Sequence, residues 1–580
     1  MRAKVFPLFA LILGLLLLQG CGTNPVTDTV KSWFKDKTAK NVQTRKISAF
    51  EYEDKLMGAW GGKMIGVSYG APYEFRSAGK IMDDPIRAWK PEYVSNALGQ
   101  DDLYVQLTYL QALEDKGLAV TSAEAGRFLA NSRYGLAHAN DIGRRNLRAG
   151  ILPPNSGHPR YNPHANDIDF QIEADLFGIL SPGMPQIAVR LAGKFGCLTN
   201  YGDGIYGGVF VAAMYTFAYF ETDPTKVVEL GLRCIPAKSE YARLIGDVLA
   251  YSREHPNPED WRGAWEMLEK KWAQNDLCPD GYGKPFNIDA KLNGGYVALA
   301  LLYGKKNFDR TLEIAVRCGQ DNDCNPSTAA GILGTILGYS RIPSEYKLGI
   351  PVISDRAFEY TNYNFNTLIQ ACKRLTGDMI ERYGGNVDRL GGLPFFSIPI
   401  QAPPPQKDAE QYTEAMLNKF KPEWPNLEKY RLENMQKILQ GQLNTWAKGW
   451  SVSSCGEQIN PGILEEYFSR FSVFVTHPVN ADTPCALTWK GKLPADKPAL
   501  NLTVASSDIS ASAEWQLRVK VNNTVVHEST IGRAAGKIEW REVKIDLSAY
   551  AGQEVTLVLE NTGDDKANRA AYWGKIAIKP

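Results

Sequence analysis

The sequence lacks several features that mark common classes of protein. Its nine cysteines include no Cys-x-x-Cys pair and no cysteine and histidine spacing typical of zinc sites. Its 65 lysines and arginines are balanced by 64 aspartates and glutamates, so no basic excess can neutralise a phosphate backbone. Beyond residue 18 no apolar run is long enough to span a bilayer. We therefore expect no zinc site, no nucleic-acid partner and no later transmembrane segment.

The first residues have the pattern of a bacterial export signal. Arg2 and Lys4 precede an apolar run over residues 5–18, which is shorter than the roughly 20 residues of a membrane-spanning helix. The run ends in the letters LQGC, which resemble a lipobox with an atypical glutamine. We predict a lipoprotein signal peptide over residues 1–21, a lipidated Cys21, and a membrane-anchored protein at the outer membrane or cell surface. An uncleaved anchor and an ordinary soluble signal remain alternatives.

The apolar pattern changes along the chain and divides it into domains. A polar tether is expected over residues 22–48. From 49 to 400 the apolar residues recur mostly at helical spacing, which predicts an all-α domain. Residues 401–450 form a proline-rich and then helical linker, and residues 451–580 change to period two. The predicted fold class is therefore multidomain, an all-α domain followed by a C-terminal β-sandwich.

The C-terminal region contains several short alternating strands. Their last residues, including Tyr572, Trp573 and Gly574, resemble a galactose-binding-type jelly roll, which implies a carbohydrate-binding role. Cys455 and Cys485 both lie here, and an exported compartment permits a disulfide between them without the sequence establishing it. The alternating apolar residues are Trp515, Leu517, Val519 and Val521, then Val543, Ile545 and Leu547, then Val555, Leu557 and Leu559.

Three motifs in the helical domain carry the candidate chemistry. The first is a glycine-rich stretch from Gly58 that continues to Gly-Ala-Pro-Tyr-Glu-Phe and ends near Glu74. The second is the pair Asp101 and Asp102 at the start of a predicted helix, where helix capping alone would also favour carboxylates. The third, residues 319–331, contains two aspartates and a helix start that we place at Asn325 as N-cap.

The aspartates of the second and third motifs form a hard oxygen ligand set. Asp321 and Asp323 lie two residues apart and repel each other unless a cation or a proton compensates their charge. Together with Asp101 and Asp102 they suit Mg²⁺ or Mn²⁺ better than zinc.

The three motifs, taken in order, closely resemble the ADP-ribosylglycohydrolase family. That family is all-helical, and its two aspartate motifs hold a pair of Mg²⁺ ions. The resemblance implies that the metal ligands are Asp101, Asp102, Asp321 and Asp323, with Mn²⁺ as a possible substitute ion. It implies that Glu74 is a base or a residue that positions water. Two close metal ions can both bind substrate and activate water.

The sequence departs from the family pattern at the edges of the aspartate motifs. Gln100 and Leu103 flank the first pair where the family usually has threonines. Asn322 and Cys324 stand in the second motif, also in place of threonines. Gln100 can still offer an amide oxygen to a metal, whereas the sulfur of Cys324 is poorly matched to Mg²⁺. These changes leave open whether one metal ion or two bind.

Two polar segments between the motifs are candidates for a rebuilt substrate pocket. The first contains Asn166 and Asp167, and the second contains Asn200 and Asp203. A solvated acidic helix and a tight loop are the structural alternatives. Just after the first pair, Asp169 and Glu173 lie four residues apart, share a predicted helical face, and could act as acid and base in sugar chemistry, whereas Asp175 is turned away.

Three functions fit the sequence. The resemblance implies a metal-dependent hydrolase of an ADP-ribosyl or related linkage. The same machinery could serve an exported glycoside hydrolase acting on an extracellular glycan, which fits a surface lipoprotein with a carbohydrate-binding domain. The substitutions at Gln100, Leu103 and Cys324 would fit a non-catalytic binding lipoprotein, although the retained aspartates and Glu74 argue against it.

Overall fold

A computed structural model describes residues 42–279, 284, 288–390, 393–508, 512–533, 538–564 and 566–580. The predicted signal peptide, the lipidated Cys21 and residues 22–41 of the predicted tether lie outside these residues. The end of that tether, Thr44–Ser48, is a β-strand. Among the described helices, none combines the length and the apolar character needed to cross a membrane.

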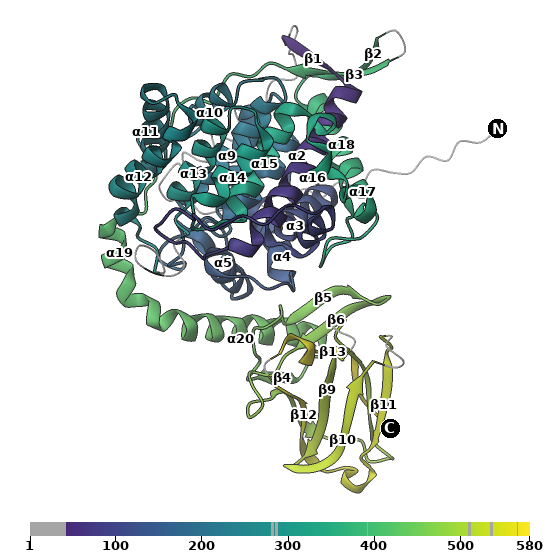
Figure 1. Ribbon diagram of the computed structural model, residues 1–580. Helices are drawn as coiled ribbons and strands as arrows, with labels where there is room; N and C mark the ends of the chain where they lie inside the picture. Colours follow the sequence, from purple (N-terminus) through teal and green to yellow (C-terminus); the bar gives the residue numbers. More distant parts are fainter. Residues whose placement is uncertain are drawn as a thin grey trace, which may run out of the picture. The chain divides into compact units, whose positions relative to one another are not determined.

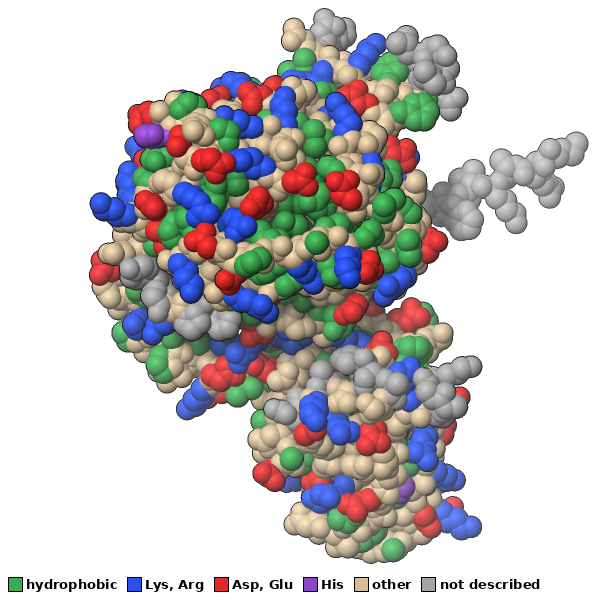
Figure 2. Space-filling view, viewed as in Figure 1, with side chains coloured by type: hydrophobic (Ala, Val, Ile, Leu, Met, Phe, Trp, Pro, Cys, Tyr) green, Lys and Arg blue, Asp and Glu red, His purple; other side chains and the backbone are tan. Residues whose placement is uncertain are grey.

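The first part of the described chain is a helical region (Figure 1). Figure 2 shows basic and acidic side chains interspersed over its visible face, as the balanced charge predicts. The main helices are α2 (Ala49–Gly70), α3 (Asp101–Lys116), α4 (Ser122–Asn131), α5 (His138–Arg148), α6 (Asp169–Glu173), α7 (Asp175–Ile179), α8 (Pro185–Gly196), α9 (Asp203–Ala218), α10 (Pro224–Leu232), α11 (Glu240–Glu254), α12 (Trp261–Trp272), α13 (Ala290–Gly304), α14 (Phe308–Arg317), α15 (Cys324–Leu337), α16 (Ser344–Lys347), α17 (Ile350–Ile353) and α18 (Phe365–Arg382).

Helices α2 and α15 pack so closely that their backbones touch. Four glycines spaced four residues apart on α2 make this approach possible, because a Cβ at any of them would meet a backbone oxygen. The added Cβ would lie 2.2 Å from the carbonyl oxygen of Gly334 at Gly58, 2.2 Å from that of Ala330 at Gly62, 2.2 Å from that of Pro326 at Gly66 and 2.0 Å from that of Asn322 at Gly70. The pairing carries the end of the first motif to the loop of the third.

A small antiparallel sheet that the sequence analysis missed closes the helical region. It consists of β1 (Thr44–Ser48), β3 (Leu393–Pro399) and β2 (Asn386–Leu390), in that order. Phe396 and Ile398 of β3 are buried, and the Phe396 ring packs edge-on against Tyr52 of α2 at 4.9 Å. The end of the predicted all-α domain is therefore strand rather than helix, because this short alternation pairs with β1 from the other end of the region.

The linker contains two helices, α19 (Glu414–Phe420) and α20 (Leu427–Trp446), joined by a 3₁₀ segment. Met435, Leu439 and Leu443 lie four residues apart on α20 and are buried in the same cluster as the core of the C-terminal region. This helix is therefore part of the hydrophobic core that follows it.

The C-terminal region is a β-sandwich, as predicted. Two five-stranded antiparallel sheets have the orders β10-β9-β12-β7-β4 and β11-β8-β13-β6-β5. The predicted apolar residues of β9 alternate with exposed or half-buried ones, and Trp515 and Trp573 lie fully buried in the core. A disulfide joins Cys455 and Cys485. The strands are β4 (Trp450–Ser453), β5 (Gly462–Tyr467), β6 (Arg470–Thr476), β7 (Cys485–Lys492), β8 (Ala499–Ser506), β9 (Glu514–Val521), β10 (Thr524–Gly532), β11 (Arg541–Asp546), β12 (Glu554–Thr562) and β13 (Ala571–Lys579).

Candidate active site

The first and third motifs meet at a backbone contact between two loops. After α2 the chain makes one short 3₁₀ turn, and the N–H of Phe75 donates to the carbonyl of Gln320 at 3.2 Å. Gly319 and Gln320 both adopt positive φ, at 82° and 61°, and a Cβ on Gly319 would lie 2.2 Å from the carbonyl oxygen of Ser77. This strained loop places Asp321 and Asp323 near Glu74 at the end of the first motif.

Helix α3 begins at Asp101, as the sequence predicts. Gln100 is its N-cap in extended conformation, and its amide nitrogen donates to Asn96 Oδ1 at 3.0 Å. Asp101 Oδ1 accepts the backbone N–H of Asp102 at 3.0 Å, whereas Asp102 itself points into the buried interior. The adjacent carboxylates therefore point to different surroundings, one half-buried and one fully buried.

Helix α15 begins two residues earlier than the sequence predicts. Its first residue is Cys324 and its N-cap is Asp323, so the predicted N-cap Asn325 lies inside the helix. The carbonyl of Asp321 already accepts the N–H of Asn325 at 3.2 Å, which extends the first turn toward the aspartates. Both aspartates of this motif consequently lie at the helix N-terminus, where its dipole favours negative charge.

Carboxylates from the second and third motifs converge on one sulfur atom. Asp101, Asp102 and Cys324 each offer a ligand atom within 4.8 Å of the others, and so do Asp321, Asp323 and Cys324. Asp102 Oδ2 and Asp321 Oδ1 are buried and have no hydrogen-bond partner among the described residues. We call these five residues the acidic centre. More than two hundred positions separate its two halves in the sequence.

A buried lysine that the sequence analysis did not single out holds one side of the acidic centre. Lys63 of α2 donates to Asp102 Oδ1 at 3.1 Å, to Asp175 Oδ2 at 2.8 Å and to the carbonyl of Ile172 at 2.9 Å. Burial alone would lower the pKa of Lys63, but the charges of Asp175 and Asp102 outweigh burial and raise it. Lys63 therefore stays charged, fixes the orientation of Asp102 and leaves its Oδ2 available.

The carboxyl groups of Asp101, Asp321, Asp323 and Glu74 resist ionisation. Desolvation, with added repulsion from Asp102 and Asp321, raises the pKa of Asp101 to about 7. Desolvation also raises the pKa values of Asp321 and Asp323. Glu74 is exposed, yet protein encloses its carboxyl group enough that desolvation and the charges of Asp321 and Asp102 raise its pKa to about 7. A bound cation would relieve this repulsion.

Asp169 and Glu173 share one face of the short helix α6, as predicted, and both contact Asn140. Asp169 Oδ1 accepts the backbone N–H of Asn140 at 3.0 Å, and the Asn140 amide donates to Glu173 Oε1. Burial raises the pKa of Asp169 to about 6 and the pKa of Glu173 well above its usual value, and the charge of Asp101 adds to the latter shift. The alternative of a solvated acidic helix is wrong, because both residues are buried.

The four predicted substrate-binding residues divide between two roles. Asn200 donates to the carbonyls of Ala165 and Asp167 at 3.2 and 2.8 Å, which makes it a brace for the loop. Asp167 Oδ2 lies 2.8 Å from His164 Nδ1, and its Oδ1 and Asn166 Oδ1 are buried without a partner among the described residues. Asp203 is buried at the start of α9, and its Oδ1 also has no such partner. Asn166, Asp167 and Asp203 thus keep oxygens available for a ligand.

A second buried ion pair, in addition to that of Lys63, lies beside these residues. Lys291 Nζ contacts Asp289 Oδ2 at 2.6 Å, and both side chains are fully buried. Asp289 is bridged to Asp167 by backbone pairing, and the N–H of Ala290 donates to the carbonyl of Asn166 at 3.0 Å. The polar segments of the predicted pocket are therefore joined to the start of α13.

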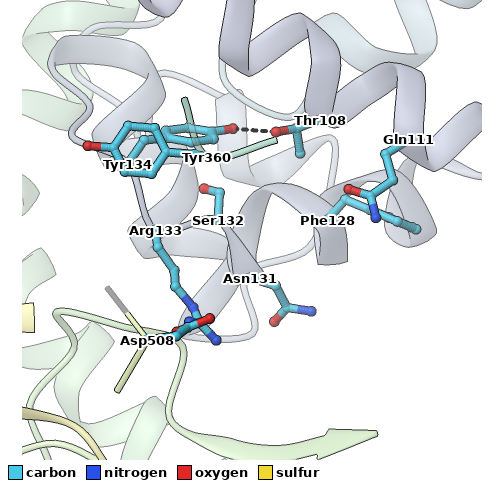
Figure 3. A pocket seen from close by; sticks show the side chains of 9 residues that line it. All are labelled: Thr108, Gln111, Phe128, Asn131, Ser132, Arg133, Tyr134, Tyr360 and Asp508. Atoms are coloured by element: carbon cyan, nitrogen blue, oxygen red, sulfur yellow. Dashed lines mark hydrogen bonds and ion pairs between the residues drawn. The ribbon is translucent and has the colours of Figure 1, made fainter. Parts of the chain in front are cut away.

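Aromatic rings border the first turn of α3. The ring centroid of Tyr104 lies 4.4 Å from that of Tyr134 and 5.6 Å from that of Tyr360. Figure 3 shows Tyr134 and Tyr360 lining a pocket with Thr108, whose hydroxyl lies 2.9 Å from that of Tyr134. Tyr104 follows Asp101 by three residues, which places it on the same side of α3. Such ring faces suit contact with a ring of a substrate.

Sequence reasoning missed Lys63, Asn140 and Asp175 as members of the site. Lys63 is the only charged residue in a stretch of small and apolar residues that forms a helix contact. A single lysine in such a stretch was the signal that could have indicated a buried ion pair. Asn140 offered no signal, since its two contacts lie 29 and 33 residues away. Asp175 was seen to turn away from Asp169 and Glu173, and the structure shows that it faces Lys63.

The sequence model of the ADP-ribosylglycohydrolase family matches residues 49–378, and the chain belongs to that family. The match covers all three motifs and more than half of the chain. It confirms the resemblance and supports a hydrolase. Members of the family generally depend on a divalent metal, and the acidic centre is a candidate cluster for such an ion here. No curated protein matches the chain.

Solved structures are similar to separate parts of the chain. One described as an ADP-ribosylglycohydrolase-related protein complex is 15% identical, covers 56% of this chain and 99% of its own, and has a TM-score of 0.36. A family 35 carbohydrate-binding module from an environmental isolate is 16% identical over 23% of this chain and 87% of its own, with a TM-score of 0.17. Another module of that family, from Paenibacillus barcinonensis, is 11% identical, covers 23% of this chain and 93% of its own, and has a TM-score of 0.16. Because all three TM-scores are below 0.5, the assignment of the chain to its family rests on the match to the sequence model of that family.

Proposed function

We propose that the protein is a divalent-metal-dependent hydrolase of glycosidic bonds, with the acidic centre as its active site. The observation that carries this proposal is the pair of buried, partnerless oxygens, Asp102 Oδ2 and Asp321 Oδ1, within a cluster of four aspartates. Carboxylate oxygens left without a partner in a protein interior are costly unless a proton or a cation compensates them. The oxygen donors fit a hard divalent cation.

Asp101, Asp102, Asp321 and Asp323 would hold the cation, and the side-chain oxygen of Gln100 is an additional donor. A cation bound there supplies Lewis acidity and favours ionisation of water. Lys63 keeps Asp102 oriented through its other oxygen. Glu74 accepts the proton of the attacking water, since it is exposed beside the acidic centre and lies outside both groups of candidate ligand atoms.

The departing group needs a proton. Asp169, with a pKa of about 6, can hold and release one near neutral pH, and Asn140 fixes its orientation. Glu173 is more strongly protonated and binds the other end of Asn140, so we assign it to positioning rather than to proton transfer. Water attack assisted by Glu74 and protonation by Asp169 complete hydrolysis of one glycosidic bond.

The family favours an ADP-ribosyl or related linkage as the substrate. One observation favours the second candidate, an uncharged extracellular glycan. The two buried lysines near the carboxylates, Lys63 and Lys291, are each ion-paired with aspartates and do not offer a free charge to a diphosphate. Hydroxyl groups of a neutral sugar could instead donate to Asn166, Asp167 and Asp203.

Hydrolysis assays with metal-loaded protein test the function and separate the two substrates. The full exported chain and its Asp321→Asn variant would be given an ADP-ribosylated peptide and a panel of neutral glycosides, each with Mg²⁺ and with Mn²⁺. The proposal is supported if the wild type hydrolyses the ADP-ribosylated peptide or a neutral glycoside, and if this activity is lost both in the variant and after addition of chelator. The compound that is hydrolysed then identifies the class of substrate. Absence of turnover on both would leave the non-catalytic binding lipoprotein as the better account.

A further inference from the structure

Cys324 lies where the two halves of the acidic centre meet. Its sulfur belongs to both groups of candidate ligand atoms, each of which spans no more than 4.8 Å. The side chain is buried, and its thiol donates a hydrogen bond to Asp323 Oδ1, with an S···O distance of 3.7 Å. No other residue is common to the two groups found among the described residues.

A second observation points to a ligand at the same place. Asp102 and Asp321, one from each group, both have a buried carboxylate oxygen without a partner among the described residues. Their side chains are at least 97% buried, with exposed fractions of 0% and 3%. Two oxygens in the groups that share the sulfur therefore lack a hydrogen bond, and a third accepts one from the sulfur itself. A metal ion bound to both oxygen and sulfur would complete this arrangement.

We infer that Cys324 is a metal ligand and that this centre prefers a divalent cation that accepts sulfur, such as Co²⁺ or Zn²⁺, over Mg²⁺. The inference rests on the proposed function, because it concerns the cation of that same centre. Mg²⁺ binds oxygen donors and accepts sulfur poorly, whereas Co²⁺ and Zn²⁺ bind thiolates together with carboxylates. A shared sulfur would shift the preference of the whole centre, since both groups of aspartates lie against it.

The competing account is that Cys324 only fills space. Its side chain is part of a small apolar cluster with Ile168, Ile172 and Ile288. A packing role requires no bond between sulfur and metal, and threonine of similar size would then serve as well. The two accounts therefore differ in the spectrum of a bound ion and in the effect of a threonine on metal preference.

Co²⁺ titration of the metal-free full chain distinguishes them. We expect a near-ultraviolet sulfur-to-cobalt charge-transfer band in the wild type that is absent in Cys324→Thr. Cys197→Ser, which removes a half-buried thiol elsewhere, is the matched control and should keep the band. Competition should show that wild type binds Zn²⁺ at least tenfold tighter than Mg²⁺, and that Cys324→Thr lowers this ratio at least tenfold.

Two results would overturn the inference in different ways. If wild type binds Co²⁺ without a charge-transfer band and Cys324→Thr keeps the same Zn²⁺ to Mg²⁺ ratio, sulfur is not a ligand and the proposed function is unaffected. If wild type binds no divalent cation, the inference and the metal-dependent function fail together. Should the threonine variant not fold, the presence or absence of the band in wild type still decides.

Discussion

Glu74 differs from the four aspartates near it because it is exposed while they are half-buried or buried. It also lies outside both groups of candidate ligand atoms. Desolvation nevertheless raises the pKa of its carboxyl group, and the nearby charges of Asp321 and Asp102 add to this shift. This combination suits a residue that exchanges protons with water beside a metal site rather than one that binds the metal.

Glu74→Gln should therefore lower turnover while leaving metal affinity almost unchanged. The amide keeps the shape of the side chain but cannot accept a proton, and loss of a general base typically costs 10²- to 10⁴-fold in rate. We expect kcat to fall by about 100-fold or more and the calorimetric affinity for Mn²⁺ to change less than about threefold. A variant that loses metal binding as well would show that Glu74 is a ligand.

Asp203 supplies a test of buried charge outside the acidic centre. Burial raises its pKa to about 7, so its folded-state pKa is above its unfolded value. Such a group contributes stability at low pH that is lost as pH rises toward 7. When the pH is raised from about 5 to about 8, the free energy of unfolding of the wild type should decrease by roughly 2–3 kcal/mol more than that of Asp203→Asn.

Urea unfolding of both proteins at the two pH values, in the same chelator, measures this difference. The comparison removes the contribution of the other carboxyl groups, which titrate in both proteins. Equal pH dependence in wild type and variant would mean that Asp203 is ionised in the fold without cost, as it would be if Lys291 compensated it fully.

Residue types and spacing predicted part of the site. The aspartates and Glu74 stood in recognisable motifs, and four-residue spacing placed Asp169 and Glu173 on one face. The partners of these residues could not be predicted in the same way. Lys63 meets Asp175 across 112 residues, and Asn140 meets Glu173 across 33, so only the tertiary fold brings these groups together.

Among the elements, α2 and α15 determine whether the acidic centre forms. A methyl group at Gly62 would lie 2.2 Å from the carbonyl oxygen of Ala330, which is backbone and cannot turn aside. Gly62→Ala should force the helices apart and destabilise the fold by about 1–3 kcal/mol or more. It should also weaken metal binding, because α15 carries Cys324 and follows Asp323.

Gly246→Ala is the matched control for this substitution. Gly246 lies inside α11, and a Cβ there would meet nothing within 4 Å. Alanine is the better helix former by roughly 0.5–1 kcal/mol, so this variant should be slightly more stable. Thermal unfolding compares the two, and a Gly62→Ala protein as stable as wild type would contradict the close packing.

The elements themselves could be predicted where the apolar period was long and regular. This held for α3 and for the strands β9 and β12, whose apolar residues face the sandwich core. The sheet of β1, β2 and β3 was missed because its strands have only five to seven residues and because β3 pairs with β1 across the whole helical region. The start of α15 was misplaced because Asn325 and Pro326 have the pattern of a helix start, whereas the N-cap position is Asp323, whose side chain makes no capping hydrogen bond.

At the scale of the whole molecule, the boundary of the C-terminal region depends on α20. The change to period two predicts that the sandwich begins at residue 451. Met435, Leu439 and Leu443 of α20 nevertheless belong to its core cluster. Burying a side chain of this kind contributes roughly 1.5–3 kcal/mol, so the helix contributes several times that amount.

A fragment of residues 427–580 should therefore be much more stable than one of residues 451–580. We expect strand-rich circular dichroism and a cooperative melt from the longer fragment, and a melting temperature lower by more than about 10 °C for the shorter one. Equal melting temperatures would show that the sandwich core does not need the helix.

The central claim is that the acidic centre binds a divalent cation. Isothermal calorimetry of the metal-free full chain with Mn²⁺ tests it most directly, with Asp321→Asn as the variant and Asp203→Asn as the control outside the centre. We predict saturable binding in wild type and control, marked weakening in Asp321→Asn, and a melting temperature that chelator lowers. Absence of binding heat in wild type, together with a melting temperature that chelator leaves unchanged, would contradict the account.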